Sequence, residues 1–394
     1  MSLRSISIFV CLAISPAASS AAEIERYLLT VEPSELEEIV ADLKANDEIN
    51  SVKVLFGEQI LITLAGDPNE SNVPKATRMF KDRVVSSASV GSIAPQEPVT
   101  NSIDSAFDYK GIVDKSAAAL TADPLNVFQW AYQNFGYEQG VAGVDTGVHS
   151  VVATGIGSII AIASTGADYT HEDLHDALWI NDNEVAGNGV DDDGNGYIDD
   201  VYGPGPQGSG NTFDEIGTGT ALAGIIAASR DNGLGISGIA PGAKVLACNT
   251  ALPTGQLSVV DILLCIDYVI DQKVVHGQNI TVFLAGFRGF SPFDQIIEPA
   301  MRALYDADIL VVAPTYMVPA GPYAGLDLDV STDSPATMDF ANILAVSALD
   351  RRAGRAFRTF GGRAIDTALP GVEVLTTLPG HIPLVDGTGL LSED

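Results

Sequence analysis

The chain has 394 residues, of which 51 are acidic and 20 basic, and its formal net charge at neutral pH is −31. A charge this negative repels nucleic acid and anionic membranes, which argues against nucleic-acid partners. The length allows one large α/β domain and a smaller one. Solubility in salty or extracellular surroundings and the binding of cations are two uses of the acidity that both stay open.

The N-terminus predicts a secretory signal peptide over residues 1–22. Arg4 supplies the positive start, residues 6–14 the apolar centre and residues 16–22 the small residues before cleavage. The apolar run is too short to cross a bilayer, and no later stretch has the length and apolarity of a membrane span. We therefore expect a secreted or lumenal protein.

Residues 23–66 predict a small α+β module made of a strand, a helix and two further strands. Pro33 suits the first turn of the helix, because its missing N–H is no loss there, and the apolar residues of 33–46 fall on one helical face. Residues 67–117 have little periodicity and many Pro, Ser, Asn and Asp residues, which predicts a linker.

Residues 118–394 predict an α/β domain with a doubly wound, mostly parallel sheet. The apolar run 159–163 stops at Ser164-Thr165-Gly166, which is typical of a buried parallel strand that ends at the carboxyl edge of a sheet. Functional sites of such sheets lie at these strand ends. Further strands are predicted at 244–248, 280–286, 308–313 and 341–349, with helices at 258–273 and 294–307.

An acidic loop follows the first strand of this domain. Its oxygen-bearing residues alternate as in the first half of an EF-hand loop, and Gly196 allows a sharp turn, but Tyr202 stands where the bidentate glutamate would be. Calcium takes roughly six to eight oxygen ligands, so the loop predicts a calcium site, with a solvated acidic turn as the alternative. The predicted ligands are Asp191, Asp193, Asn195, Tyr197 through its carbonyl, Asp199 and Asp200.

Two cysteines, Cys248 and Cys265, remain once Cys11 leaves with the signal peptide. In an oxidising compartment they could form a disulfide or stay as two buried thiols, because spacing alone does not fix their distance.

Several segments, in chain order, resemble motifs of the subtilisin-like serine proteases, or subtilases. Residues 159–174, IIAIASTGADYTHEDL, resemble the segment in which Asp-Thr-Gly or Asp-Ser-Gly carries the catalytic carboxylate. Residues 217–224, GTGTALAG, resemble GHGTHVAG, and the closing VDGTGLLSED aligns with GTSMATPHVAG. The resemblance implies a subtilisin-like fold, with residues 23–66 similar to the family's inhibitory propeptide.

The resemblance also assigns catalytic roles to positions that cannot perform them. Ser164 stands at the aspartate position, Thr218 at the histidine position, Gly389 at the serine position and about Met317 at the oxyanion asparagine. A serine protease needs a hydroxyl, an imidazole, a carboxylate and oxyanion donors. We therefore expect a pseudoprotease.

Other residues take expected roles from the family alone. Phe283, Leu284 and Ala285 match the Ser-Leu-Gly whose backbone pairs with substrate. The acidic loop binds calcium in many subtilases, and Asp173 matches a ligand of a second, weaker calcium site that Asp231 and Asn232 could complete. Subtilases of some single-celled eukaryotes carry cysteines in a matching strand and helix, which favours a disulfide between Cys248 and Cys265.

The chain stops five residues after Gly389, where subtilases continue into a long buried helix. We expect a C-terminally truncated fold in which Ile225 and Ile226 lose their cover, and each exposed side chain forfeits roughly 1.5–3 kcal/mol. A partner or another chain could fill the groove, the fold could be poor, or the gene product could be incomplete.

The leading hypothesis is a secreted, calcium-binding pseudoprotease that binds peptides or a protein partner. The alternatives are an active subtilisin-like endopeptidase with a rearranged site, and a regulator of an active subtilase that uses residues 23–105 as an inhibitor. None of the three involves nucleic acid or a membrane span.

Overall fold

The structure is a computed structural model, and part of the chain is described. The described residues are 25–30, 35–45, 49–55, 59–64, 78–81, 84–87, 122–289, 293–315, 327–355 and 363–380. The expected signal peptide, most of the expected linker, Met317 and Gly389 lie outside them. Among the described residues, no helix is long and apolar enough to cross a membrane.

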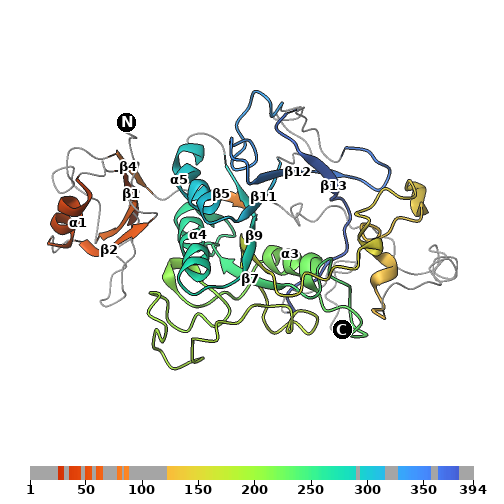
Figure 1. The fold of residues 1–394 in the computed structure, drawn as a ribbon, viewed down its shortest axis with the longest axis horizontal. Helices are drawn as coiled ribbons and strands as arrows, with labels where there is room; N and C mark the ends of the chain where they lie inside the picture. The colour runs from red at the N-terminus through yellow and green to blue at the C-terminus, as the bar shows by residue number, and fades with distance from the viewer. Residues whose placement is uncertain are drawn as a thin grey trace.

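A six-stranded parallel sheet forms the centre of the large domain, in the order β13-β12-β11-β9-β6-β7 (Figure 1). This confirms the doubly wound, mostly parallel α/β fold. The strands are β6 (Ile159–Ser164), β7 (Lys244–Asn249), β9 (Ile280–Ala285), β11 (Leu310–Pro314), β12 (Ile343–Leu349) and β13 (Thr367–Pro370).

Helices cover both faces of this sheet. Helix α3 (Thr218–Ala227) packs on one face, and α4 (Val259–Val274) and α5 (Phe293–Asp306) pack on the other. Because successive strand residues point to opposite faces, Ala161 and Ala163 of β6 join the cluster with α4 and α5, whereas Ile162 joins the cluster with α3. Short 3-10 helices lie at Asn126–Phe128, Tyr137–Gln139, Val148–Ser150 and Pro206–Gly208.

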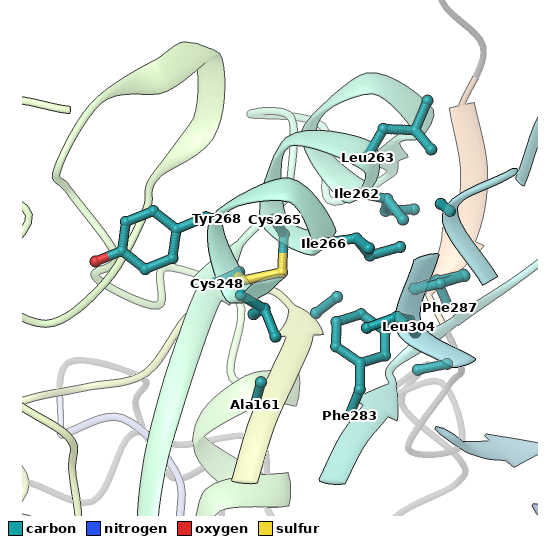
Figure 2. Packing of buried hydrophobic residues seen from close by; sticks show 14 of the residues in the cluster. Ala161, Cys248, Ile262, Leu263, Cys265, Ile266, Tyr268, Phe283, Phe287 and Leu304 are labelled. Carbon is teal, nitrogen blue, oxygen red and sulfur yellow. A yellow bond between two sulfur atoms is a disulfide. The ribbon is translucent and has the colours of Figure 1, made fainter. Parts of the chain in front are cut away.

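A disulfide between Cys248 of β7 and Cys265 of α4 fastens the sheet to its helical layer (Figure 2). The two Cα atoms lie 5.9 Å apart, within the range that a disulfide requires. The expected pairing is therefore present, and the alternative of two buried thiols is not.

The N-terminal residues form a separate antiparallel sheet in the order β2-β3-β1-β4, with one helix. The elements are β1 (Glu25–Thr30), α1 (Leu36–Lys44), β2 (Ile49–Leu55), β3 (Gln59–Leu64) and β4 (Arg78–Lys81). The strand–helix–strand–strand order was expected, and Ile39 and Leu43 are the buried residues of α1. In Figure 1 this module (red to orange) lies beside α4 and α5.

Two strands fall inside the range that was predicted to be a linker, and at these strands the linker prediction was wrong. β4 pairs with β1, and β5 (Val84–Ser87) pairs antiparallel with both β8 (Leu257–Ser258) and β10 (Phe287–Arg288). Such short strands carry no periodicity of their own, because their hydrogen bonds come from partners distant in the sequence. As a result β5 becomes the middle strand of a three-stranded sheet.

The apolar residues of α3 are better covered than expected. Ile225 and Ile226 are both half-buried, and Ile226 packs against the cluster that contains Ala223 and Ala227. The segment before residue 380 contributes, since Leu375 packs against the same cluster.

Candidate functional site

Ser164 ends β6 at the carboxyl edge of the sheet, and it is completely buried. Its Oγ has no hydrogen-bond partner among the described residues. The backbone of Gly286, just after β9, passes so close that a Cβ built there would lie 2.8 Å from Ser164 Cβ. Ser164, which the resemblance places at the aspartate position of the family, therefore lies in a small, closed space, and its hydroxyl is unpaired among the described residues.

Thr218 begins helix α3 and is half-buried. Two other side chains hold this helix N-terminus. Asp214 Oδ2 accepts hydrogen bonds from the backbone N–H and the hydroxyl of Thr220, at 2.8 and 2.7 Å. Thr165 Oγ1 accepts the N–H of Gly219 at 2.8 Å. The start of the helix is thus held by Asp214 and Thr165.

Asp168 lies at the same edge, although the sequence reading did not single it out. Its Oδ1 accepts the N–H and the hydroxyl of Thr170, and its Oδ2 accepts the N–H of Gly380. Burial would raise the pKa of this carboxyl group, but these hydrogen bonds outweigh it and lower the pKa. Asp168 therefore ties the segment after β13 to the strand end, and the Asp-x-Thr spacing was the signal that could have found it.

The described histidines make their polar contacts elsewhere. The side-chain partners are Tyr132 O and Asp145 for His149, the Asp173 N–H for His171, Asp176 for His175 and Asp271 for His276. In the described part of the chain no imidazole makes a polar contact with Ser164 or Thr218. These residues therefore do not assemble a general base at the sheet edge.

The predicted groove residues belong to the interior of the sheet. Phe283 is completely buried in the core against Phe287, with ring centroids 6.4 Å apart (Figure 2), and Leu284 is half-buried. The strand pairs with β6 on one side and with β11 on the other. Contact of Phe283, Leu284 or Ala285 with a substrate stays a prediction.

The acidic loop brings three carboxylates together. Oxygen atoms of Glu184, Asp191 and Asp193 all lie within 4.8 Å of one another. Glu184 was not among the predicted ligands, because it precedes the alternating pattern. It also orders the loop, since its oxygens accept the backbone N–H groups of residues 192, 193 and 199.

The other predicted loop ligands have different partners. The Asp199 carboxylate accepts the backbone N–H groups of Asn188 and Gly189, both at 3.0 Å. The Asn195 side chain accepts the N–H of Tyr197 and donates to Asp200. Asp191 and Asp193 are thus the two predicted side chains that the structure brings into the three-carboxylate cluster.

Asp200 supplies an observation that fits a cation. It is completely buried, its Oδ2 accepts the Tyr268 hydroxyl at 2.5 Å, and its Oδ1 has no partner among the described residues. The Asn181 amide lies 3.0 Å from Asp193 and 3.4 Å from Asp200, so these carboxylates flank one group. Burial raises the pKa of Glu184, and the negative charges of Asp200 and Asp193 raise it further. A cation would offset the burial of these carboxylates and the repulsion among their negative charges.

The residues of the expected second calcium site also meet. Asp173 accepts the Asn232 amide at 2.9 Å and the Ile236 N–H at 3.0 Å, and burial raises the pKa of its carboxyl group. Asp123, which the sequence reading missed, binds the same loop through the N–H of Asp231 and the hydroxyl of Ser237. In the structure these groups satisfy one another by hydrogen bonds.

Comparisons with known proteins agree with this architecture. The model of the Subtilase family, Peptidase_S8, matches residues 155–382, which is more than half of the chain. Subtilisin-like protease 1 of Plasmodium berghei is 29% identical over 236 residues, covering 57% of this chain and 38% of that protein. The alkaline protease of Alkalihalobacillus alcalophilus is 26% identical over 382 residues, covering 96% of this chain and 81% of that protein.

The chain thus spans less than two fifths of the length of the Plasmodium relative. Among solved structures, fervidolysin from Fervidobacterium pennivorans, described as a keratinolytic enzyme related to subtilisin, aligns with a TM-score of 0.59 at 18% identity. The alignment covers 100% of this chain and 52% of the other. At 18% identity this similarity supports a shared fold and nothing further.

Proposed function

The chain belongs to the subtilase family, and from that membership we propose that it is a secreted, calcium-binding subtilase homologue that binds peptides or a protein partner without cutting them. The observation that carries the proposal is the family's aspartate position, where Ser164 is buried and its Oγ has no partner in the described part of the chain. Thr218 at the histidine position supplies no imidazole.

Among the described residues, no imidazole contacts Ser164 or Thr218 to perform the steps of the missing groups. An imidazole takes the proton of the nucleophile, and a carboxylate orients that imidazole. A threonine hydroxyl cannot act as a general base near neutral pH, and Gly389 at the serine position has no side chain. Loss of the serine or the histidine in subtilisin lowers turnover by about 10⁶-fold. The alternative of an active protease with a rearranged site needs an imidazole, and the described histidines are engaged elsewhere.

Calcium is part of the proposal, because the acidic loop offers the oxygen ligands that it prefers. Glu184, Asp191 and Asp193 would hold the ion, and the Asn181 amide links Asp193 to Asp200, whose Oδ1 has no partner among the described residues. The ion would supply positive charge that offsets the repulsion among these side chains. Its role would be structural, since these carboxylates belong to a loop separate from the Ser164 edge.

Peptide binding is supported by strand β5, which pairs with two strands of the large domain. Residues 84–87 lie between β8 and β10 and pair antiparallel with both, so these two edges bind an extended chain through backbone hydrogen bonds. Addition of a strand to such edges is a common mode of peptide recognition. A peptide that binds at this place would have to displace residues 84–87.

The proposal is tested by incubating the purified full chain with casein and with fluorogenic peptides in calcium buffer. We expect no hydrolysis above a buffer blank, and we expect measurable binding of at least one extended peptide by fluorescence anisotropy. Hydrolysis that disappears when Ser164 and Thr218 are both changed to alanine would establish an active protease instead. Absence of both hydrolysis and peptide binding would agree with the pseudoprotease assignment, but it would rule out the peptide-binding part of the proposal.

A further inference from the structure

Lys53 connects the N-terminal module to two parts of the large domain. It lies on β2, and its Nζ is 3.2 Å from Asp267 Oδ2 on helix α4. The same ammonium group lies 5.2 Å from the ring centroid of Tyr197, which belongs to the acidic loop. A single positive charge therefore contacts both the helix and the predicted cation-binding loop.

Leu55 reinforces this contact from the same face of β2. Residues two apart on a strand point to the same side, and Leu55 is completely buried in the core cluster that contains Tyr197 and Tyr268. Val54 between them points away and is 40% exposed. The large domain thus offers a surface that takes an extended strand with a basic residue and, two positions later, an apolar one.

Tyr197 is also linked to the carboxylates on its other side. Its ring meets the Tyr268 ring edge-on, with centroids 5.2 Å apart and planes at 89°. The Tyr268 hydroxyl donates to Asp200 Oδ2, and the Tyr197 N–H donates to Asn195 Oδ1 at 2.8 Å. The ring is therefore fixed between Lys53 and the residues that shape the acidic loop.

We infer that docking of strand β2 and cation binding in the acidic loop are thermodynamically coupled, so that each strengthens the other through the contact of Lys53 with Tyr197. The inference rests on the proposed calcium site. A docked β2 holds Tyr197 in place, and the loop then loses less conformational freedom when it closes around an ion. By linkage, the ion strengthens docking by the same factor.

Net charge alone predicts that loss of Lys53 strengthens Ca²⁺ binding, whereas the coupling predicts that it weakens Ca²⁺ binding. The two effects can therefore be distinguished by experiment. Replacing a lysine by methionine makes a protein of net charge −31 more negative, and this attracts cations more strongly. Coupling through the ring contact instead predicts weaker binding when Lys53 is lost. Lys44 is a matched control, because it is an exposed lysine on α1 of the same module.

The experiment is calorimetric titration of Ca²⁺ into the full chain at fixed ionic strength. We expect Lys53→Met to weaken binding about fivefold or more, a typical lower value for coupled sites, and Lys44→Met to leave it unchanged or slightly tighter. Equal or tighter binding by Lys53→Met would overturn the coupling while leaving the calcium site intact. A wild-type chain that binds no Ca²⁺ would overturn both the calcium part of the proposed function and the inference.

A second pair of variants covers the case in which Lys53→Met folds poorly. Tyr197→Phe keeps the ring beneath the ammonium group and should bind Ca²⁺ like the wild type, whereas Tyr197→Leu should bind it as weakly as Lys53→Met. Hydrogen exchange of residues 49–55 gives the reciprocal readout. Ca²⁺ should slow this exchange in the wild type and in Tyr197→Phe but not in Tyr197→Leu, and equal slowing in all three would contradict the coupling.

Discussion

Ser164 and Thr165 are neighbouring hydroxyl residues at the end of β6, and both are buried. Thr165 Oγ1 accepts the N–H of Gly219 at the start of α3, whereas Ser164 Oγ has no partner in the described part of the chain. A buried polar group without a hydrogen bond costs free energy, and a bonded one stabilises modestly. These two residues should therefore respond in opposite ways to loss of the hydroxyl.

We predict that Ser164→Ala leaves the free energy of unfolding unchanged or raises it by about 1 kcal/mol, because it removes an unsatisfied group. Thr165→Val keeps the shape of the side chain but leaves the Gly219 N–H without its acceptor. It should lower the free energy of unfolding by about 1–3 kcal/mol. Urea denaturation of the two variants measures both, and a larger loss in Ser164→Ala than in Thr165→Val would contradict the described hydrogen bonding.

Asp168 gives a prediction about pH. Its pKa in the folded chain lies below the ordinary value of 3.8. Between the two values the unfolded chain binds more protons, so stability rises with pH in this window. The stability that the Asp168 carboxylate contributes is fully present above the ordinary pKa, and it is lost as the pH falls through the pKa of the folded chain.

Asp168→Asn should therefore be less stable than the wild type at neutral pH, by about 1–3 kcal/mol for the weakened hydrogen bonds. The difference between the two proteins should shrink as the pH falls below about 4. Thermal melts of both proteins between pH 3 and pH 7 provide the measurement. A difference that stays constant over this range would show that the charge of Asp168 contributes nothing.

Helix α3 packs unusually closely, and its glycines make that possible. A Cβ on Gly219 would overlap the carbonyl oxygen of Gly166, and a Cβ on Gly224 would overlap the Thr377 side chain. Thr377 also donates from its hydroxyl to Thr220 O at 2.8 Å. The helix is thus fitted between the end of β6 and the segment after β13.

At this scale we predict that Gly219→Ala and Gly224→Ala are each destabilising by several kcal/mol, because no room exists for the added methyl group. The clash of Gly224→Ala is with a side chain, so Thr377→Ala should relieve part of it. The double variant should then lose less stability than the sum of the single variants. Additive losses in urea denaturation would argue against the close approach of helix and segment.

The sequence predicted regular elements well where their pattern is local. The apolar runs of β6, β9 and β11 and the amphipathic face of α4 gave strands and helices close to those observed. β4 and β5 were missed because strands this short depend on partners far away in the chain. For the same reason Glu184 was missed: it joins Asp191 and Asp193 only after the loop folds back.

The whole molecule combines a subtilase scaffold with an N-terminal module that packs on α4 through Leu55 and Lys53. The order of the motifs in the sequence predicted the scaffold. The docking contacts could not be predicted, because no sequence pattern relates Lys53 to Asp267 or to Tyr197. The stability of the whole molecule should depend on bound calcium as well as on contacts within the chain.

We predict that removing calcium with EGTA lowers the midpoint of thermal unfolding. An ion present at 100 times its dissociation constant stabilises the folded state by about 2.7 kcal/mol. Asp191→Asn combined with Asp193→Asn should abolish the calcium dependence without requiring EGTA. An unfolding midpoint that is the same with EGTA and with calcium would show that calcium does not stabilise the folded chain.

We propose that a subtilase framework is retained here while the groups that transfer protons and attack carbonyl carbons have been replaced. The most direct measurement is labelling of the full chain with a fluorophosphonate probe in calcium buffer, followed by mass spectrometry of every serine and threonine, with an active subtilase in parallel. We expect labelling of the active enzyme and none of this chain. Stoichiometric labelling of a single hydroxyl in this chain would contradict it.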